Sequence, residues 1–165
     1  MLRFSLRLNN DLPVHEYVRL ARAAEAAGFD QFWVSNDLFL RAASVILSAV
    51  AVATQRLQIG TCIVNPYTLH AAEMAMMAAT LDELSGGRFN LGIAAGAAQF
   101  LKWVGIEQTR PIAALRETIH ALRLLFRGER AALDGQFLRW TDESYLRCVP
   151  PRRHIPIYVG ALSPN

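Results

Sequence analysis

Two adjacent polar residues, Asn36 and Asp37, directly follow the strongly apolar stretch Phe32-Trp33-Val34. A carboxylate in such a position can accept a proton or orient a hydrogen-bond donor during a reaction. Asparagine and aspartate are also frequent at the N-cap of a helix, and Leu38-Phe39 could begin that helix. The residue types alone leave the catalytic and the capping interpretations open.

Other residues of possible chemical use follow or interrupt other apolar stretches. Cys62 lies inside one of them, and a buried, inert thiol is the simpler interpretation because no basic residue adjoins it. His70 comes near a helix start, where a structural role is favoured. Gly92 and Gly96 bracket the end of a further stretch, where glycine would let a planar ring approach the backbone. The sequence contains no metal-ligand spacing, nucleophile elbow or phosphate loop, so we expect no metal site.

Strand-like and helix-like patterns alternate along the chain. Apolar residues recur at period two from Leu2 to Leu8, as in a strand with one buried face, and Gly28 and Gly128 mark helix ends. The patterns predict strands over 2–8, 31–35, 57–64, 88–94 and 155–161. They predict helices over 13–28, 40–53, 69–84 and 111–128, and an irregular segment over 129–151 with a small hairpin around Asp134-Gly135.

Five strands separated by helices indicate an α/β fold with a parallel sheet and right-handed crossovers. The first turn, Asn9-Asn10-Asp11-Leu12-Pro13, contains no glycine, which disfavours a doubly wound dinucleotide-binding fold and favours a barrel. We expect a single domain over 1–165, with an insertion around 129–151. In a barrel the active site lies at the carboxyl ends of the strands. That rule selects Ser35, Asn36, Asp37, Asn65, Pro66, Tyr67, His70, Ala95, Gly96, Gln99, Ser163 and Asn165.

The composition narrows the class of protein further. Hydrophobic residues make up 53% of the 165 residues, but no apolar run is long enough to cross a bilayer and no signal peptide is evident. Two widely separated cysteines suit a reducing compartment, so we expect a cytoplasmic location and no membrane partner. The net charge of +3 is scattered along the chain, which disfavours nucleic acid as a partner.

Several segments in order resemble those of the luciferase-like oxidoreductases, the flavin- or deazaflavin-dependent family of bacterial luciferase and methylenetetrahydromethanopterin reductase. The most specific segment is Thr80-Leu81-Asp82-Glu83-Leu84-Ser85-Gly86-Gly87-Arg88-Phe89, followed by Leu91 to Gly96. The others are 24–30 with 32–35, 59–68 and 157–161. The resemblance implies a (β/α)8 TIM barrel, of which this chain would be the amino-terminal part with about five of eight strands.

Within the family, the loop Asn65-Pro66-Tyr67-Thr68 is similar to that of the reductase branch, whose members transfer hydride with coenzyme F420. Other branches use FMN and molecular oxygen. The resemblance implies that the third strand carries a bulge with a non-proline cis peptide at Cys62–Ile63, which supports the coenzyme ring. The cofactor-binding residues would be Cys62, Ile63, Val64, Asn65, Ala95 and Gly96, and the catalytic residues Asp37 and Asn36.

The chain departs from the family pattern at three places. Members commonly have Asp-His where this chain has Asn36-Asp37, and an acidic residue where it has Ala97 after Gly96. The sequence also ends after the fifth predicted strand, which would leave two open sheet edges able to pair with another chain, as in a homo-oligomer. Three functions follow as hypotheses: an F420-dependent oxidoreductase of a small-molecule substrate, an FMN-dependent monooxygenase, and a non-catalytic half-barrel that acts as an assembly partner.

Overall fold

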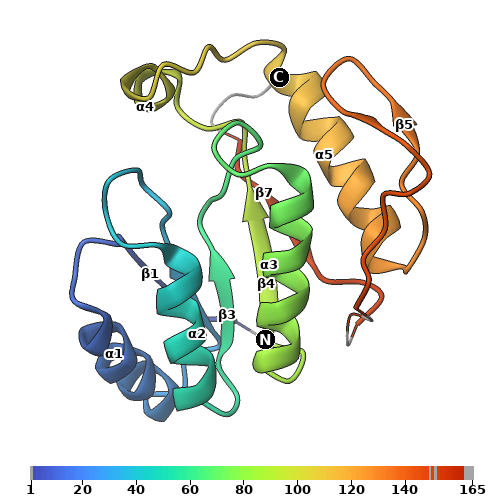
Figure 1. The fold of residues 1–165 in the computed structure, drawn as a ribbon. Helices are drawn as coiled ribbons and strands as arrows, with labels where there is room; N and C mark the ends of the chain where they lie inside the picture. The colour runs from blue at the N-terminus through green and yellow to red at the C-terminus, as the bar shows by residue number, and fades with distance from the viewer. Residues whose placement is uncertain (1, 149, 151, 162–165) are drawn as a thin grey trace.

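The computed structural model describes residues 2–148, 150 and 152–161, and its main feature is one sheet of five parallel strands (Figure 1). The order across the sheet is β1-β2-β3-β4-β7, and every neighbouring pair is parallel. The strands are β1 (Ser5–Leu8), β2 (Gln31–Val34), β3 (Gln58–Thr61), β4 (Phe89–Ile93) and β7 (Ile157–Val159). The predicted α/β class with five parallel strands is therefore confirmed.

Four of the five helices cover one face of the sheet, which we call the outer face. The helices are α1 (Val14–Ala26), α2 (Ala43–Ala53), α3 (Ala71–Leu84), α4 (Ala98–Trp103) and α5 (Pro111–Phe126). Helices α1, α2, α3 and α5 contact one another in that order (Figure 1). The core between them and the sheet contains Phe32, Ile59 and Leu91, all fully buried. Burial of this apolar surface is the main driving force for the fold.

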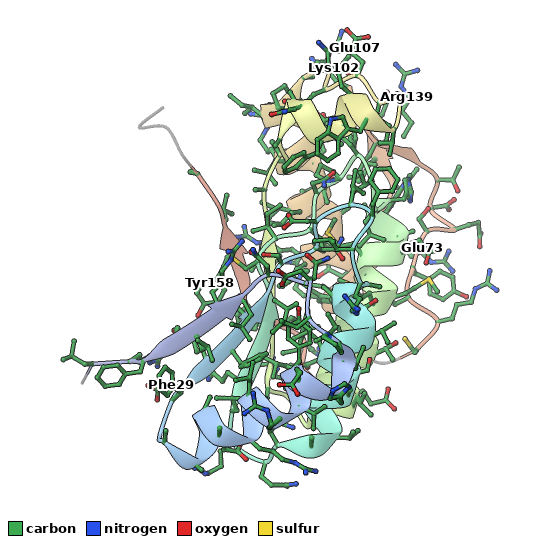
Figure 2. The ribbon with its side chains drawn as sticks, turned by 90° about the vertical axis from the view of Figure 1, so that its left-hand side faces the viewer. Phe29, Glu73, Lys102, Glu107, Arg139 and Tyr158 are labelled. Carbon is green, nitrogen blue, oxygen red and sulfur yellow. The ribbon has the colours of Figure 1, made fainter. Side chains whose placement is uncertain are left out.

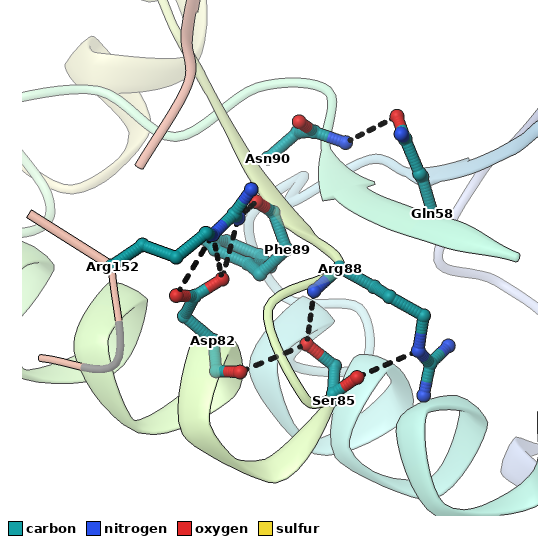
Figure 3. Close-up of polar contacts among 7 residues, drawn as sticks. All are labelled: Gln58, Asp82, Ser85, Arg88, Phe89, Asn90 and Arg152. Carbon is teal, nitrogen blue, oxygen red and sulfur yellow. Dashed lines mark hydrogen bonds and ion pairs between the residues drawn. The ribbon is translucent and has the colours of Figure 1, made fainter. Parts of the chain in front are cut away.

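The opposite, inner face of the sheet carries a row of polar side chains. Ser5 donates to the Gln31 side-chain oxygen at 2.9 Å, and the Gln31 amide donates to Gln58 at 3.2 Å. The Asn90 amide donates to the same Gln58 oxygen at 3.3 Å, as Figure 3 shows. We call this row, from β1 to β4, the carboxamide ladder. It ties together four neighbouring strands near their amino ends.

The family-like segment at the end of α3 forms a hydrogen-bonded clamp below β4 (Figure 3). The Arg88 guanidinium donates to the Ser85 carbonyl at 2.6 Å, and to the carbonyls of Ala51 and Leu57 at 2.8 Å each. Asp82, which is fully buried, accepts two further N–H groups from Arg152. The segment that most resembles the family thus ties α2, α3, β4 and the approach to β7 together.

The predicted hairpin is present between α5 and β7. Strands β5 (Leu133–Asp134) and β6 (Arg139–Trp140) pair in antiparallel fashion. Phe137 and Leu138, at the turn, belong to a small apolar cluster with Ala71 of α3 and Ala121 of α5. This hairpin lies on the outer side of α5 (Figure 1).

Several strands and helices begin or end at other residues than the sequence predicted. Strand β1 begins at Ser5, and Leu2 and Phe4 are exposed. Helix α2 begins at Ala43, because the Asn10 side chain binds the carbonyls of Asp37 and Arg41 and holds the preceding residues in a turn. Helix α4 was not predicted. It belongs to a segment that crosses the strand ends, where Lys102 and Glu107 lie (Figure 2).

Candidate active site

A cleft of about 560 Å³ opens at the carboxyl ends of the strands. Its size is in the usual range for small-molecule and cofactor sites. The strand ends and the loops that follow them form most of the wall, and α4 closes one side. The lining residues are Arg7, Asn36, Asp37, Leu38, Cys62, Ile63, Asn65, Ala94, Ala95, Gly96, Ala97, Phe100, Leu101, Gly160 and Ala161. Seven of the eight residues proposed from the sequence are in this set, and only Val64 is not.

The end of β3 explains why Val64 differs from its neighbours. The peptide bond between Cys62 and Ile63 is cis, as the resemblance implied. Cys62 N–H still donates to the Val34 carbonyl at 2.7 Å, but the chain then bulges and rejoins β4, with Val64 N–H donating to Gly92 at 3.0 Å. Cys62 and Ile63 consequently line the cleft, whereas the Val64 side chain is 1% exposed and packs in the core.

Asn65 shapes the loop that follows the bulge. Its side-chain oxygen accepts the backbone N–H groups of Tyr67 at 3.1 Å and Thr68 at 3.0 Å, which is an Asx-type turn. The side chain also lies against Gly96, where a Cβ would come within 3.1 Å of the Asn65 Cγ. Gly96 has φ +81°, a conformation that favours glycine. Asn65 and Gly96 are therefore packed together at the mouth of the cleft.

The end of β4 is held from the segment that crosses the strand ends. The Gln108 side-chain amide donates to the carbonyls of Ala95 at 2.8 Å and Gly96 at 2.9 Å. The Tyr67 hydroxyl donates to the Thr109 carbonyl at 2.6 Å, and burial raises the pKa of this phenol above its usual value. These bonds fasten residues 108–109 to the end of β4 and to the loop after β3.

Asn36 and Asp37, the pair after β2, are held in place by different contacts. The Asn36 side-chain oxygen accepts the Ala43 N–H at 3.2 Å, so it caps the start of α2, although that helix begins later than expected. Asp37 is fixed through its backbone, since its N–H donates to the Asn10 side chain at 3.2 Å. Asn10 is itself fully buried. Asp37 thus lines the cleft from a loop that a buried side chain holds in place.

Arg7 is a cleft residue that the sequence analysis missed. Its guanidinium donates to the Asn9 side chain at 2.8 Å and to the Ser35 hydroxyl at 2.6 Å. The period-two pattern of β1 contained the signal, because Leu6 and Leu8 pack toward the core and Arg7 must then face inward. Phe100 and Leu101 were missed as well, since α4 is too short to give a helical repeat.

The remaining sequence candidates lie away from the cleft or outside the described residues. His70 accepts the Ala72 N–H at 3.3 Å and caps α3, which is a structural role. At Gly92 a Cβ would come within 1.9 Å of the Thr61 carbonyl oxygen, so the close neighbour is the β3 backbone. Gln99 lies on α4 and does not line the cleft. Ser163 and Asn165 lie outside the described residues.

A larger hollow, of about 710 Å³, lies along α5, away from most of the strand ends, so it is not the candidate active site. Its lining is mainly the apolar side of α5, including Ile112, Leu115 and Ile119, and Ala95 is the one strand-end residue that reaches it. Within the described ranges no group of three His, Cys, Asp or Glu side chains is placed to hold a metal ion. In that same part of the chain no helix is long and apolar enough to span a membrane.

A parallel sheet with helices on its outer face and a cleft at the strand carboxyl ends is the arrangement that defines TIM-barrel enzyme sites. The family model described as luciferase-like monooxygenase matches residues 3–165, and the chain belongs to that family.

Among characterised relatives, 5,10-methylenetetrahydromethanopterin reductase from Methanolobus tindarius is 32% identical over 153 residues, which cover 93% of this chain and 46% of the reductase. The chain thus spans about half the length of the curated relatives it matches. The coenzyme F420-dependent tetrahydromethanopterin reductase from Methanopyrus kandleri superposes with a TM-score of 0.91 at 25% identity, over 99% of this chain and 51% of that one.

A more distant match indicates the fold alone. The oxygenating constituent of 3,6-diketocamphane monooxygenase from Pseudomonas putida, solved with FMN, superposes with a TM-score of 0.74 at 18% identity, over 84% of this chain and 44% of that one. The proteins that share this fold thus include a reductase named for coenzyme F420 and a monooxygenase solved in complex with FMN.

Proposed function

We propose that this chain is the amino-terminal part of an oxidoreductase barrel that transfers hydride between coenzyme F420 and a small-molecule substrate. The observation that carries the proposal is the bulged end of β3, where Cys62 and Ile63 line the strand-end cleft together with Gly96. The similarity to two methanopterin reductases supports the choice of F420. The segment 129–151, which contains the β5–β6 hairpin, would be an insertion in the fourth βα unit of a single domain.

The residues of the cleft suit a flat aromatic ring. Gly96 and Gly160 carry no side chain, and Ile63, Ala94 and Ala95 are apolar, so a planar group could lie against this wall. Cys62, Ile63, Val64, Asn65, Ala95 and Gly96 would form the cofactor site, with Val64 contributing through the backbone of the bulge. When bound, the deazaflavin supplies the hydride chemistry, and the protein contributes binding and orientation.

Asp37 is the proposed proton-transfer residue, and Asn36 positions it. The Asp37 carboxylate lies at the cleft on a loop that Asn10 holds, while Asn36 anchors the next residues to α2. Replacing Asp37 by asparagine should keep the loop and lower kcat by about 100-fold, a usual size for a general acid–base effect. Replacing the exposed Glu107 by glutamine removes the same charge from outside the lining and should leave kcat unchanged. Equal kcat values for D37N and the wild type would exclude Asp37 from the reaction.

The first test is a fluorescence titration of the purified chain with coenzyme F420 and, separately, with FMN. Saturable binding of F420 alone supports the proposal. Saturable binding of FMN with oxygen uptake would instead support a monooxygenase, for which the FMN-bound structural neighbour is the specific observation. Binding of neither would mean that these five strands do not build enough of the site, or that the chain has left the family's chemistry. A mass in solution that matches two chains, with no cofactor bound, would then support the third candidate, a non-catalytic half-barrel that acts as an assembly partner. We also propose a cytoplasmic location, which fractionation of cells expressing the protein would test.

A further inference from the structure

Arg7 differs from the other cleft residues in its charge. Of the described residues that line the cleft, Arg7 is the one with a guanidinium and Asp37 the one with a carboxyl group. Within the described part of the chain, no carboxylate lies within 4 Å of the Arg7 guanidinium, whereas ion pairs of that length occur for Arg19, Arg127 and Arg152. The positive charge of Arg7 is therefore not neutralised by a direct partner.

The direction of the Arg7 side chain is set by two neutral groups. The Asn9 oxygen follows β1 and the Ser35 hydroxyl follows β2, and the guanidinium donates to both. Because both acceptors lie beyond the strand ends, the side chain is drawn from the inner face toward the mouth of the cleft. Ser35 is fully buried, so its hydroxyl is a fixed point of attachment. These bonds orient the guanidinium without cancelling its charge.

Two aromatic side chains, Trp33 and Tyr158, lie on the inner face beside Arg7. Trp33 is in register with Arg7 on the neighbouring strand, and its ring covers Gly60, where a Cβ would come within 2.4 Å of the indole. The other side of Trp33 meets Tyr158 edge to face, with the ring centres 5.0 Å apart. Tyr158 projects from β7 into this inner face (Figure 2). The aromatic pair therefore lies beside Arg7 on the inner face, and the exposed Arg7 side chain lines the strand-end cleft next to it.

We propose that Arg7 binds an oxyanion of the substrate, a carboxylate or a phosphate, in the strand-end cleft. A guanidinium carries five N–H groups, and the two observed bonds leave donors for a ligand. Its planar fork matches the paired oxygens of a carboxylate or phosphate, and its fixed orientation lowers the entropic cost of binding. The proposal rests on the proposed function in so far as the cleft is the substrate site, and it makes the substrate an anionic molecule.

The test uses small probes that differ in charge but not in shape. Benzoate and benzamide are such a pair, and phenyl phosphate extends the comparison to phosphate. Trp33 emission reports binding next to Arg7, in a variant whose other two tryptophans are replaced (W103F and W140F). We expect saturable changes with benzoate or phenyl phosphate and none with benzamide. Equal responses to benzoate and benzamide, or no saturation by either anion, would overturn the proposal.

Variants at Arg7 separate a bound oxyanion from a solvated arginine. R7Q should raise the half-saturating concentration of the anion at least about tenfold, the size expected for one charge-assisted hydrogen bond, and R7K should give an intermediate value. R3Q is the matched control, because Arg3 precedes the same strand at its other end and does not line the cleft. An R7Q protein with the wild-type unfolding midpoint and R3Q-like anion binding would refute the site.

The coenzymes themselves carry phosphate, so a final comparison identifies the source of the oxyanion. F420 should bind R7Q and the wild type with affinities within about threefold if Arg7 belongs to the substrate subsite. Loss of F420 binding in R7Q, with benzoate binding unchanged, would assign Arg7 to the coenzyme and overturn the substrate proposal. Arg7-dependent benzoate binding in a chain that binds neither coenzyme would refute the proposed function but leave the oxyanion site standing.

Discussion

The guanidinium of Arg152 forms a paired contact with the carboxylate of Asp82, seventy residues earlier in the chain. The Arg152 Nε donates to Asp82 Oδ1 at 3.0 Å and the Nη2 to the same oxygen at 2.5 Å, and Nη2 also donates to the Phe89 carbonyl. Asp82 is fully buried, while the Arg152 side chain keeps 34% of its exposed area. The contact joins the C-terminal part of α3 to the segment that leads into β7, at the end of the sheet opposite the cleft.

Removing the Asp82 carboxylate should destabilise the fold. D82A leaves the half-buried Arg152 charge without a partner, and we expect a loss of about 2–3 kcal/mol, at the lower end for a broken buried pair because Arg152 is partly hydrated. E83A changes the adjacent, exposed carboxylate and should cost less than about 0.5 kcal/mol. Urea unfolding of the two variants measures the difference. Equal stabilities would mean that the contact contributes nothing net.

Replacing Arg88 by lysine should destabilise the fold. The Arg88 fork donates to five groups from three segments, including the Ala51 and Leu57 carbonyls, and a lysine can satisfy only some of them. R88K should therefore lose about 2 kcal/mol, from the acceptors left without donors. R56K is the control, because the exposed Arg56 guanidinium donates, among the described residues, to the Glu25 carbonyl alone. The idea fails if both lysine variants unfold at the same urea concentration.

Gly92 should tolerate no side chain. A Cβ at this position would come within 1.9 Å of the Thr61 carbonyl oxygen, so β3 and β4 would have to separate. We expect G92A to lose about 3 kcal/mol or to be recovered as insoluble protein. At Gly160 the nearest atom is the Ala94 side chain at 3.3 Å, so G160A should remain folded with a smaller loss. A soluble G92A with a wild-type melting temperature would show that the strands can move apart at little cost.

The stability of the hairpin should depend on pH through Glu117. The Leu138 N–H lowers the pKa of this carboxyl most, partial burial raises it, and the Phe137 and Gln136 N–H groups lower it further, so the net shift is downward from 4.5. A depressed pKa in the folded state contributes stability above pH 4.5 that is lost as the pH falls through the folded pKa.

Comparing the wild type with E117Q isolates this contribution. The difference in unfolding free energy should be largest near neutral pH and should shrink as the pH falls below 4.5, since the wild-type carboxyl then becomes uncharged as well. Urea unfolding at several pH values measures it, and the carbon NMR signal of the Glu117 carboxyl gives its pKa directly. A difference that stays constant across the pH range would contradict the assignment.

The order of the elements could be predicted from the sequence because it depends on local patterns. Alternating and helical apolar repeats, with glycines at the helix ends, identified all five parallel strands. The predicted ends of elements were wrong where a residue distant in sequence determines them. The Asn10 side chain, for example, binds the Asp37 and Arg41 carbonyls, and α2 therefore begins later than predicted. The six residues of α4 contain too few turns for a helical repeat to be recognised.

Most of the candidate site could be predicted from the positions of the strand ends. The rule that barrel sites lie at strand carboxyl ends brought together Asn36, Asp37, Cys62, Asn65 and Gly96, which do share one cleft. The cis peptide at Cys62 came from the family resemblance, since nothing in the local residue types specifies it. The period-two pattern of β1 places Arg7 on the inner face, but it does not show that the side chain reaches the cleft. That depends on the bonds to Asn9 and Ser35, which only the structure reveals.

The carboxamide ladder on the inner face has a consequence for how the strands find their partners. Side chains alternate between the two faces, so a shift of one residue between β2 and β3 would turn Gln58 toward the helices and bring Ile59 inside. Such a shift would break the bonds from Gln58 to both Gln31 and Asn90 and would bury a carboxamide among apolar side chains. A misaligned pairing therefore loses these hydrogen bonds and also pays for burying a polar group. The carboxamide ladder thus favours the native register of the sheet as it assembles.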